Sequence, residues 1–154
     1  MLVDTVLCEV QPPKSGGAQW VHLLTHGEMS ARDGRRFVLA DAAAVVERTL
    51  ARAGKAHLPI DYEHQTDLAA ENGRPAPAAG WISQLSVRAD GIWALVDWTA
   101  KARAMLAARE YRYISPTFMA DKDTGTVQGG EKTIQWSACV CAGAGGVKVG
   151  HWIG

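Results

Sequence analysis

The stretch GWISQLSVRADGIWALVDW, residues 80–98, contains the clearest hairpin pattern in this chain. Its first half alternates between two faces, and an Ala-Asp-Gly turn then leads into an apolar run at residues 92–98. A pattern of this kind around a glycine-containing turn is typical of a β-hairpin. The two faces expected for its first strand are Trp81, Ser83, Leu85 and Val87, and Ile82, Gln84 and Ser86.

The segments on either side of this hairpin predict short strands and two helices. Apolar or alternating runs predict strands at residues 18–25, 37–39, 58–62, 111–119 and 133–141. Asp41 is an N-cap for a helix that ends at about Ala53 before Gly54, and Thr99 begins a second helix to about Glu110. The stripes expected to be buried on the two helices are Val45, Val46, Thr49, Leu50 and Ala53, and Ala102, Met105 and Leu106. This order of elements predicts an α+β fold, mainly an antiparallel β-sheet or barrel with a few helices, in a single domain over residues 1–154.

The composition of the chain argues against several classes of binding partner. The 154 residues include 16 Lys and Arg and 16 Asp and Glu, so the chain has no net field that attracts nucleic acid or anionic lipid. The three cysteines form neither a CxxC motif nor a zinc knuckle, which indicates a reducing compartment. The sequence shows neither a signal peptide nor an apolar run long enough to span a membrane. We therefore expect no nucleic acid partner, no membrane contact, no cofactor and no resident metal.

His64 follows directly on the expected strand LPIDY, in the stretch LPIDYEHQTD at residues 58–67. A histidine at the end of a strand is more often a hydrogen-bonded structural residue than a catalyst. A strand-to-loop junction, however, holds an exposed side chain rigidly, and the nearby Asp61 and Glu63 favour the imidazolium form. His64 is therefore a candidate general base as well as a candidate structural residue.

The best candidate nucleophile is Ser115, in EYRYISPTF at residues 110–118. Pro116 biases Ser115 toward extended backbone, so the strand sets the direction of the hydroxyl. The segment lacks the GxSxG elbow of many hydrolases, and a serine that simply ends a strand before a proline is the alternative interpretation. If both residues are catalytic, Ser115 and His64 should lie on neighbouring strands or their ends, with heavy atoms within about 3 to 4 Å.

The remaining histidines and the tryptophans have structural and functional interpretations. His22 and His26 are spaced HxxxH, but on an expected strand and turn, where they would not converge on a metal. A metal-dependent hydrolase would instead use His57, Asp61 and His64. Five tryptophans on expected strands are core or sheet-face residues, or line a substrate groove: Trp20, Trp81, Trp93, Trp98 and Trp136.

Several separated segments resemble one family. LPIDYEHQT, APAAGWISQL, DGIWALVDWT and EYRYISPTF, in this order, are similar to the protease region of the Mu-like phage I proteins, which are prohead maturation proteases. The upstream segment WVHLLTHGEMSARDGRRFVL is similar as well, so the resemblance covers about residues 18–120. It implies a serine endopeptidase that cleaves phage scaffold and capsid proteins inside assembling proheads in the host cytoplasm, with a homo-oligomer as a further expectation.

A more distant resemblance is to the herpesvirus assemblins, which are serine proteases. They share an order of histidine, glycine-containing strand, glycine-centred turn, helix and Tyr-x-x-x-Ser segment. The matching residues here are His64, Gly80, Gly91, the helix from Thr99, and Tyr111 to Ser115. The resemblance implies an assemblin-like fold in which Ser115 is the nucleophile and His64 is the base that takes the hydroxyl proton and returns it to the leaving amine.

The third catalytic group is where the sequence departs from the assemblins. They supply a second histidine on a strand after the nucleophile, whereas TIQWSACVCAG at residues 133–143 offers only Ser137 at that place. A dyad backed by Ser137 is one alternative, and Asp61 or Glu63 as the orienting carboxylate is the other. Strand alternation points one of these two carboxylates away from His64.

The glycine-rich residues 142–154 also depart from the I proteins, which continue into a long helical scaffold region. We hypothesise a truncated or altered C-terminus. Gly143, Gly145 and Gly146 either offer backbone N–H donors for an oxyanion hole or are disordered. The alternative function is therefore a capsid-assembly or scaffold module that keeps the protease fold without a working active site.

Overall fold

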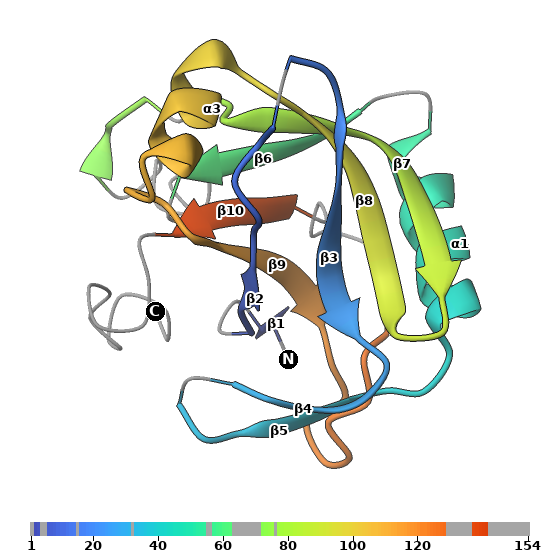
Figure 1. The fold of residues 1–154 in the computed structure, drawn as a ribbon. Coiled ribbons are helices and arrows are strands. Elements are labelled where there is room, and N and C mark those ends of the chain that lie inside the picture. The colour runs from blue at the N-terminus through green and yellow to red at the C-terminus, as the bar shows by residue number, and fades with distance from the viewer. Residues whose placement is uncertain are drawn as a thin grey trace.

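The computed structural model describes residues 2–3, 6–14, 16–31, 33–54, 57–62, 72–75, 77–128 and 137–141. Its elements, labelled as in Figure 1, are β1 (Leu2–Val3), β2 (Cys8–Glu9), β3 (Gln19–Thr25), β4 (Gly27–Ser30), β5 (Arg36–Leu39), α1 (Ala42–Ala53), β6 (Leu58–Tyr62), β7 (Gly80–Arg88), β8 (Gly91–Trp98), α3 (Ala100–Ala107), β9 (Tyr113–Met119) and β10 (Ser137–Cys141). The sequence did not predict β1, β2 and β4, which are short.

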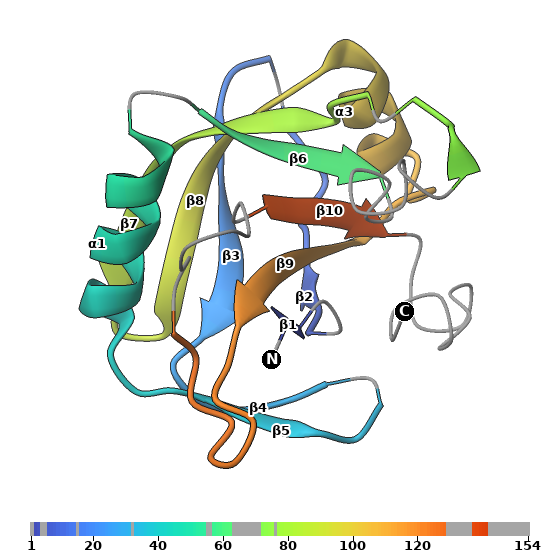
Figure 2. The same ribbon diagram turned by 180° about the vertical axis from the view of Figure 1, so that it is seen from behind.

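Most of the strands form one curled sheet. Its main path runs β1, β9, β10, β6, β7, β8, β3, and β2 pairs with β9 beside β1. Within this sheet, the strand pairings of the described residues are antiparallel except that of β10 with β6, which is parallel. The sheet curls into a half-barrel, with β3 and β8 nearest the viewer in Figure 1 and β6, β9 and β10 nearest in Figure 2. The predicted α+β class with mainly antiparallel strands is confirmed.

The β7–β8 hairpin forms the middle of this sheet, as the sequence predicts. Its register shifts between Ile82 and Gln84, so that Ile82 pairs with Val96 and Leu85 with Ala94. Val96 and Ala94 are both buried, and they lie two residues apart on one face of β8. Leu85 therefore shares a face with Ile82, and the simple alternation expected for this strand is wrong. A bulge of this kind increases local twist, which helps the sheet to curl.

Helix α1 begins and ends at the predicted residues. Asp41 accepts a hydrogen bond from the Ala44 N–H at 3.0 Å, and Gly54 ends the helix with a φ of 64°. The helix packs on β7 and β8 through a buried stripe that includes Val45, Val46 and Thr49. Leu50 is 44% exposed, so its expected place on that stripe is wrong.

Helix α3 begins as predicted and ends earlier. Thr99 accepts a hydrogen bond from the Ala102 N–H at 3.2 Å, and the helix stops at Ala107 rather than near Glu110. Arg109, with a φ of 61°, takes the left-handed conformation that often follows a helix end. The expected stripe is confirmed for Ala102 and Leu106, which are buried. In the ranges given above, no helix is long and apolar enough to cross a membrane.

The inner face of the curled sheet holds an apolar core. Its largest fully buried side chains are Phe37, Phe118, Leu23, Leu24, Leu39, Ile60, Ile92, Leu106, Ile114 and Val10. Phe37 of β5 meets Phe118 of β9 edge to face, with ring centroids 5.8 Å apart. This contact joins the separate β4–β5 hairpin to the strand that carries Ser115.

We expect Gly91→Ala to destabilise the fold more than Gly34→Ala. Both glycines have positive φ, +134° and +90°, so each alanine costs about 1–2 kcal/mol of backbone strain. A Cβ at Gly91 would also clash with the carbonyl oxygen of Leu24 in β3, whereas Gly34 has open space around it. Gly34→Ala should lower the Tm by about 2–8 °C, and Gly91→Ala should lower it by at least twice as much. Equal shifts in thermal unfolding would contradict the close approach of β3 to the β8 end of the hairpin.

Candidate active site

Ser115 lies inside β9 and has no exposed surface. β10 pairs along residues 113–117 of β9, while β2 and β1 pair with the two ends of β9 on the opposite edge. Pro116, which has no N–H to donate, falls between the β2 and β1 pairings. The prediction that a strand holds Ser115 in extended backbone is confirmed, and the interpretation that Ser115 ends a strand is wrong.

Strand β10 aligns Ser115 with a carboxylate two strands away. Cys139 of β10 is opposite Ser115 in β9 and opposite Asp61 in β6. Residues opposite each other in a sheet share a face, so Asp61 and Ser115 point the same way with position 139 between them. Strands about 4.8 Å apart place the two Cα atoms about 10 Å apart, which is too far for a direct hydrogen bond between such short side chains.

The Asp61–Ser115 row lies on the outer face of the sheet. The adjacent row is formed by Tyr62, Val140 and Ile114, and Val140 and Ile114 are fully buried in the core. Side chains alternate along a strand, so Asp61 and Ser115 point away from that core. Both are nonetheless buried, Asp61 at 3% exposure and Ser115 at 0%.

The expectation that His64 and Ser115 lie on neighbouring strands or their ends stays a prediction, because His64 is outside the described residues. His64 follows β6, and β10 separates β6 from β9. His64 itself, Glu63 and the three glycines proposed for an oxyanion hole, Gly143, Gly145 and Gly146, lie outside the described residues. Their roles stay predictions.

Two of the three groups considered for orienting His64, Ser137 and Asp61, occupy different rows of the sheet. Ser137 is opposite Thr117 in β9, two residues along the strand from Ser115. Asp61 is in the row of Ser115 itself. A buried carboxylate costs several kcal/mol unless it is paired or hydrogen-bonded, and groups of this kind cluster at functional sites. The register therefore places Asp61, and not Ser137, in the row of Ser115.

A thiol also lies beside β9. Cys8 of β2 is opposite Ile114, and its thiol donates a hydrogen bond to the Leu23 carbonyl at 3.5 Å. Burial raises the pKa of Cys8 to about 11, although a hydrogen bond with Thr25 lowers it. At neutral pH the thiol therefore stays protonated and is a poor nucleophile. Cys8 does not compete with Ser115 for that role.

His22 of β3 contacts the β7–β8 hairpin. The His22 ring stacks on Trp93 with centroids 4.9 Å apart, and its Nε2 lies 3.0 Å from the Asp90 carbonyl oxygen. Among the residues that the structure describes, no three His, Cys, Asp or Glu side chains form a group that could hold a metal. The set of His57, Asp61 and His64 includes a residue beyond this part, so the structure does not test it.

Comparison with known proteins assigns the chain to a family. Residues 21–131, more than half of the chain, match the family described as Mu-like prophage I protein, N-terminal domain. The chain belongs to this family. The matched range of the I protein domain contains Asp61, His64 and Ser115, and it ends before β10 begins.

Two relatives of this I protein domain are longer than the chain. The chain is 33% identical to Protease I of Escherichia phage Mu over 124 residues, which cover 70% of this chain and 34% of that protein. It is 27% identical to the Mu-like prophage FluMu I protein of Haemophilus influenzae over 118 residues, 68% of this chain and 33% of that protein. The chain thus spans about a third of the length of these relatives. No solved structure matches it.

Sequence reasoning missed two parts that position this site. The N-terminal strands β1 and β2, which pair with β9, have two residues each and give no periodic signal. Position 139 was also missed, because the pairing of β10 with both β6 and β9 is a long-range property of the sheet. The extended pattern at residues 133–141 predicted a strand in this region, but it did not predict that β6 and β9 would be the neighbours of that strand.

Proposed function

We propose that this chain is the protease domain of a phage prohead maturation enzyme, a serine endopeptidase that cleaves scaffold and capsid proteins during head assembly. Membership of the I protein family and the similarity to a protein named Protease I support this proposal. The observation that carries it is the row of Asp61 and Ser115 on one face of the sheet, within the range that the family match covers. In this proposal the cleavage takes place inside assembling proheads in the host cytoplasm and requires no cofactor.

In the proposed reaction the Ser115 hydroxyl oxygen attacks the scissile carbonyl carbon while His64 takes the hydroxyl proton. The tetrahedral intermediate collapses, the C–N bond breaks, and His64 returns the proton to the leaving amine. Water then attacks the acyl-enzyme with His64 again as base, which releases the acid product and restores Ser115. Asp61, buried in the row of Ser115, is proposed to orient the imidazole and to stabilise its charged form.

One observation favours the alternative function, a capsid-assembly or scaffold module without a working active site. Ser115 has no exposed surface, so a substrate can reach its hydroxyl only after a local rearrangement around β9. Because only molecules in the rearranged form can react, turnover falls in proportion to the fraction of molecules in that form. Slow turnover suits a protease that acts once, at high local concentration in a closed shell, and homo-oligomers or crowding would then raise its activity.

We expect Ser115→Ala and His64→Ala each to stop self-cleavage. Loss of a nucleophile or its base typically lowers a protease rate by several orders of magnitude. Shortening of the chain with time, followed by intact-mass spectrometry with and without a crowding agent, measures this. Ser83→Ala is the matched control, because Ser83 is exposed on β7.

Two outcomes of that time course would count against the proposal. Unchanged shortening of Ser115→Ala would move the nucleophile to another residue. A parent chain that never shortens, even when crowded, would favour the scaffold module.

We expect Asp61→Asn to lower kcat/KM by about 10² to 10⁴ and Ser137→Ala by less than about threefold. A carboxylate beside an imidazole raises the histidine pKa, so its removal lowers that pKa. The acidic limb of the kcat/KM profile, where His64 becomes protonated and loses its function as base, should therefore move to lower pH in Asp61→Asn.

Circular dichroism must first show that Asp61→Asn is folded, because Asp61 is buried. A purely structural role would lower activity with the acidic limb unchanged. A large loss in Ser137→Ala with none in Asp61→Asn would reverse the assignment.

A further inference from the structure

Trp81 is an exposed tryptophan on the sheet that carries the proposed site. It lies on β7 and is 44% exposed, although tryptophan is usually a well-buried residue. Across the sheet it is opposite Pro59 of β6 on one side and Asp97 of β8 on the other. Within the described part of the chain, its ring stacks on no other ring and on no cation.

The register places Trp81 on the same face as Ser115. Pro59 and Asp61 are two residues apart on β6, so their side chains share a face. Trp81 is opposite Pro59, and Asp61 shares the row of Ser115. The indole, the proline ring and the proposed nucleophile therefore belong to one outer face of the half-barrel.

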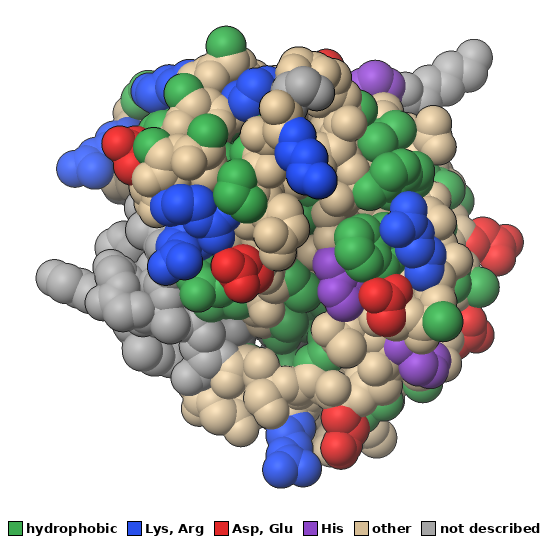
Figure 3. Space-filling view, viewed as in Figure 1, with side chains coloured by type: hydrophobic (Ala, Val, Ile, Leu, Met, Phe, Trp, Pro, Cys, Tyr) green, Lys and Arg blue, Asp and Glu red, His purple; other side chains and the backbone are tan. Residues whose placement is uncertain are grey.

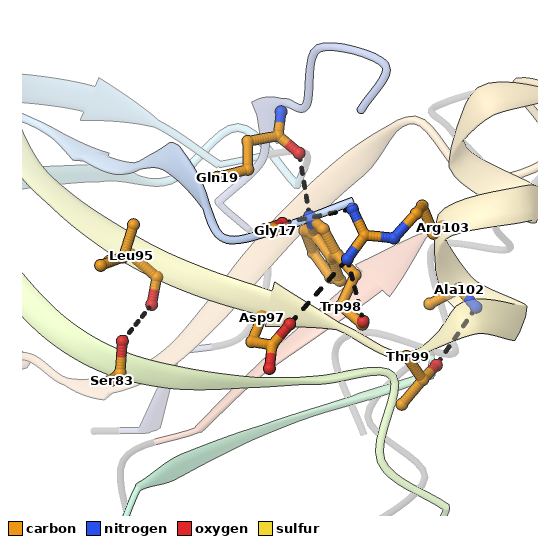
Figure 4. A network of polar contacts seen from close by, with 9 residues as sticks. All are labelled: Gly17, Gln19, Ser83, Leu95, Asp97, Trp98, Thr99, Ala102 and Arg103. Carbon is orange, nitrogen blue, oxygen red and sulfur yellow. Dashed lines mark hydrogen bonds and ion pairs between the residues drawn. The ribbon is translucent and has the colours of Figure 1, made fainter. Parts of the chain in front are cut away.

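The β8 side of Trp81 is fixed by a polar network. Arg103 of α3 lies 3.9 Å from the Asp97 carboxylate and donates hydrogen bonds to the carbonyls of Gly17 and Trp98 (Figure 4). Trp98 in turn donates from Nε1 to the Gln19 side chain at 3.0 Å. The Arg103 cation thus offsets the charge of Asp97. Strand β8, which pairs with β7 at Trp81, is anchored to α3 and to the start of β3.

A second aromatic cluster on this face, formed by Trp20, Trp93 and His22, differs from Trp81 because its rings already contact one another or a cation. Figure 3 shows hydrophobic, histidine and basic side chains close together over β3 and β8. The Arg88 guanidinium lies 4.8 Å from the Trp20 ring centroid and 4.7 Å from that of Trp93. Trp93 also stacks on His22 and donates to Asp90 at 2.7 Å, which holds the pKa of Asp90 below its usual range. These contacts join the β7–β8 turn to β3, so this cluster has a structural role that Trp81 lacks.

We propose that Trp81 and Pro59 form a subsite that binds an apolar side chain of the peptide substrate. β7 lies three strands from β9, about 14 Å across the sheet, and the row of Trp81 and Pro59 is offset by two residues along the strands from the row of Asp61 and Ser115. An extended peptide advances about 3.3 Å per residue, so the bound side chain belongs to a residue four or five positions from the scissile bond. This inference rests on the proposed function, because the substrate has to reach Ser115.

Cleavage of a mixed library of twelve-residue peptides by the full chain tests the subsite. Mass spectrometry of the products gives the preference for each residue type at each position on both sides of the cut. We expect Leu, Phe or Trp to exceed Ala by about tenfold at one position four or five residues from the bond. Trp81→Ala should reduce this preference to less than about threefold, and Trp81→Phe should keep most of it.

Trp20→Ala is the control variant, since Trp20 is 37% exposed on the same outer face but at the far edge strand. It should retain the full preference. Two results would overturn the Trp81 subsite and leave the proposed function standing. One is cleavage without an apolar preference four or five residues from the bond, and the other is a preference that Trp81→Ala leaves intact. If no protein of the set cleaves any peptide, the proposed function fails and this inference fails with it.

Discussion

The parallel pairing of β10 with β6 is the constraint on which the candidate site depends. β10 bonds to β6 along one edge and to β9 along the other, so its register alone sets how Asp61 faces Ser115. Parallel neighbours need a long connection, and here it contains the β7–β8 hairpin, α3 and β9. The middle of the domain is therefore the connection that allows β10 to lie between the two strands of the site.

The two faces of the β6, β10 and β9 strands carry opposite chemistry. Toward the inside, Ile60, Val140 and Ile114 join the apolar core, whose burial supplies the main stabilising free energy. Toward the outside, Asp61, Ser115 and Thr117 are polar and yet buried, which opposes folding unless their polar atoms are hydrogen-bonded. A sheet selected for stability alone would place apolar residues on both buried faces. Buried polar groups of this kind cluster at functional sites, which fits the role proposed for this face.

Local signals in the sequence predicted the elements well. Asp41, Gly54 and Thr99 mark helix ends because capping is a property of a few adjacent residues, and the hairpin at residues 80–98 follows from its turn. Leu50 was misplaced because tertiary packing, which sequence periodicity does not reveal, decides which part of the α1 surface is covered. The shared face of Ile82 and Leu85 was missed because a bulge changes strand periodicity without a distinctive residue. The site itself was predicted as far as Ser115 on a rigid strand, but not its separation from β6, because strand order depends on contacts remote in sequence.

Labelling with a fluorophosphonate shows whether Ser115 is an activated nucleophile, because the reagent forms a covalent bond only with such a hydroxyl. Trypsin cleaves after Arg112 and Lys122, so residues 113–122 form one peptide that contains Ser115. We expect a covalent adduct on Ser115 in this peptide, reduced in His64→Ala and absent in Ser115→Ala. An adduct on another residue, or an unlabelled Ser115 in a chain that still cleaves itself, would contradict this expectation.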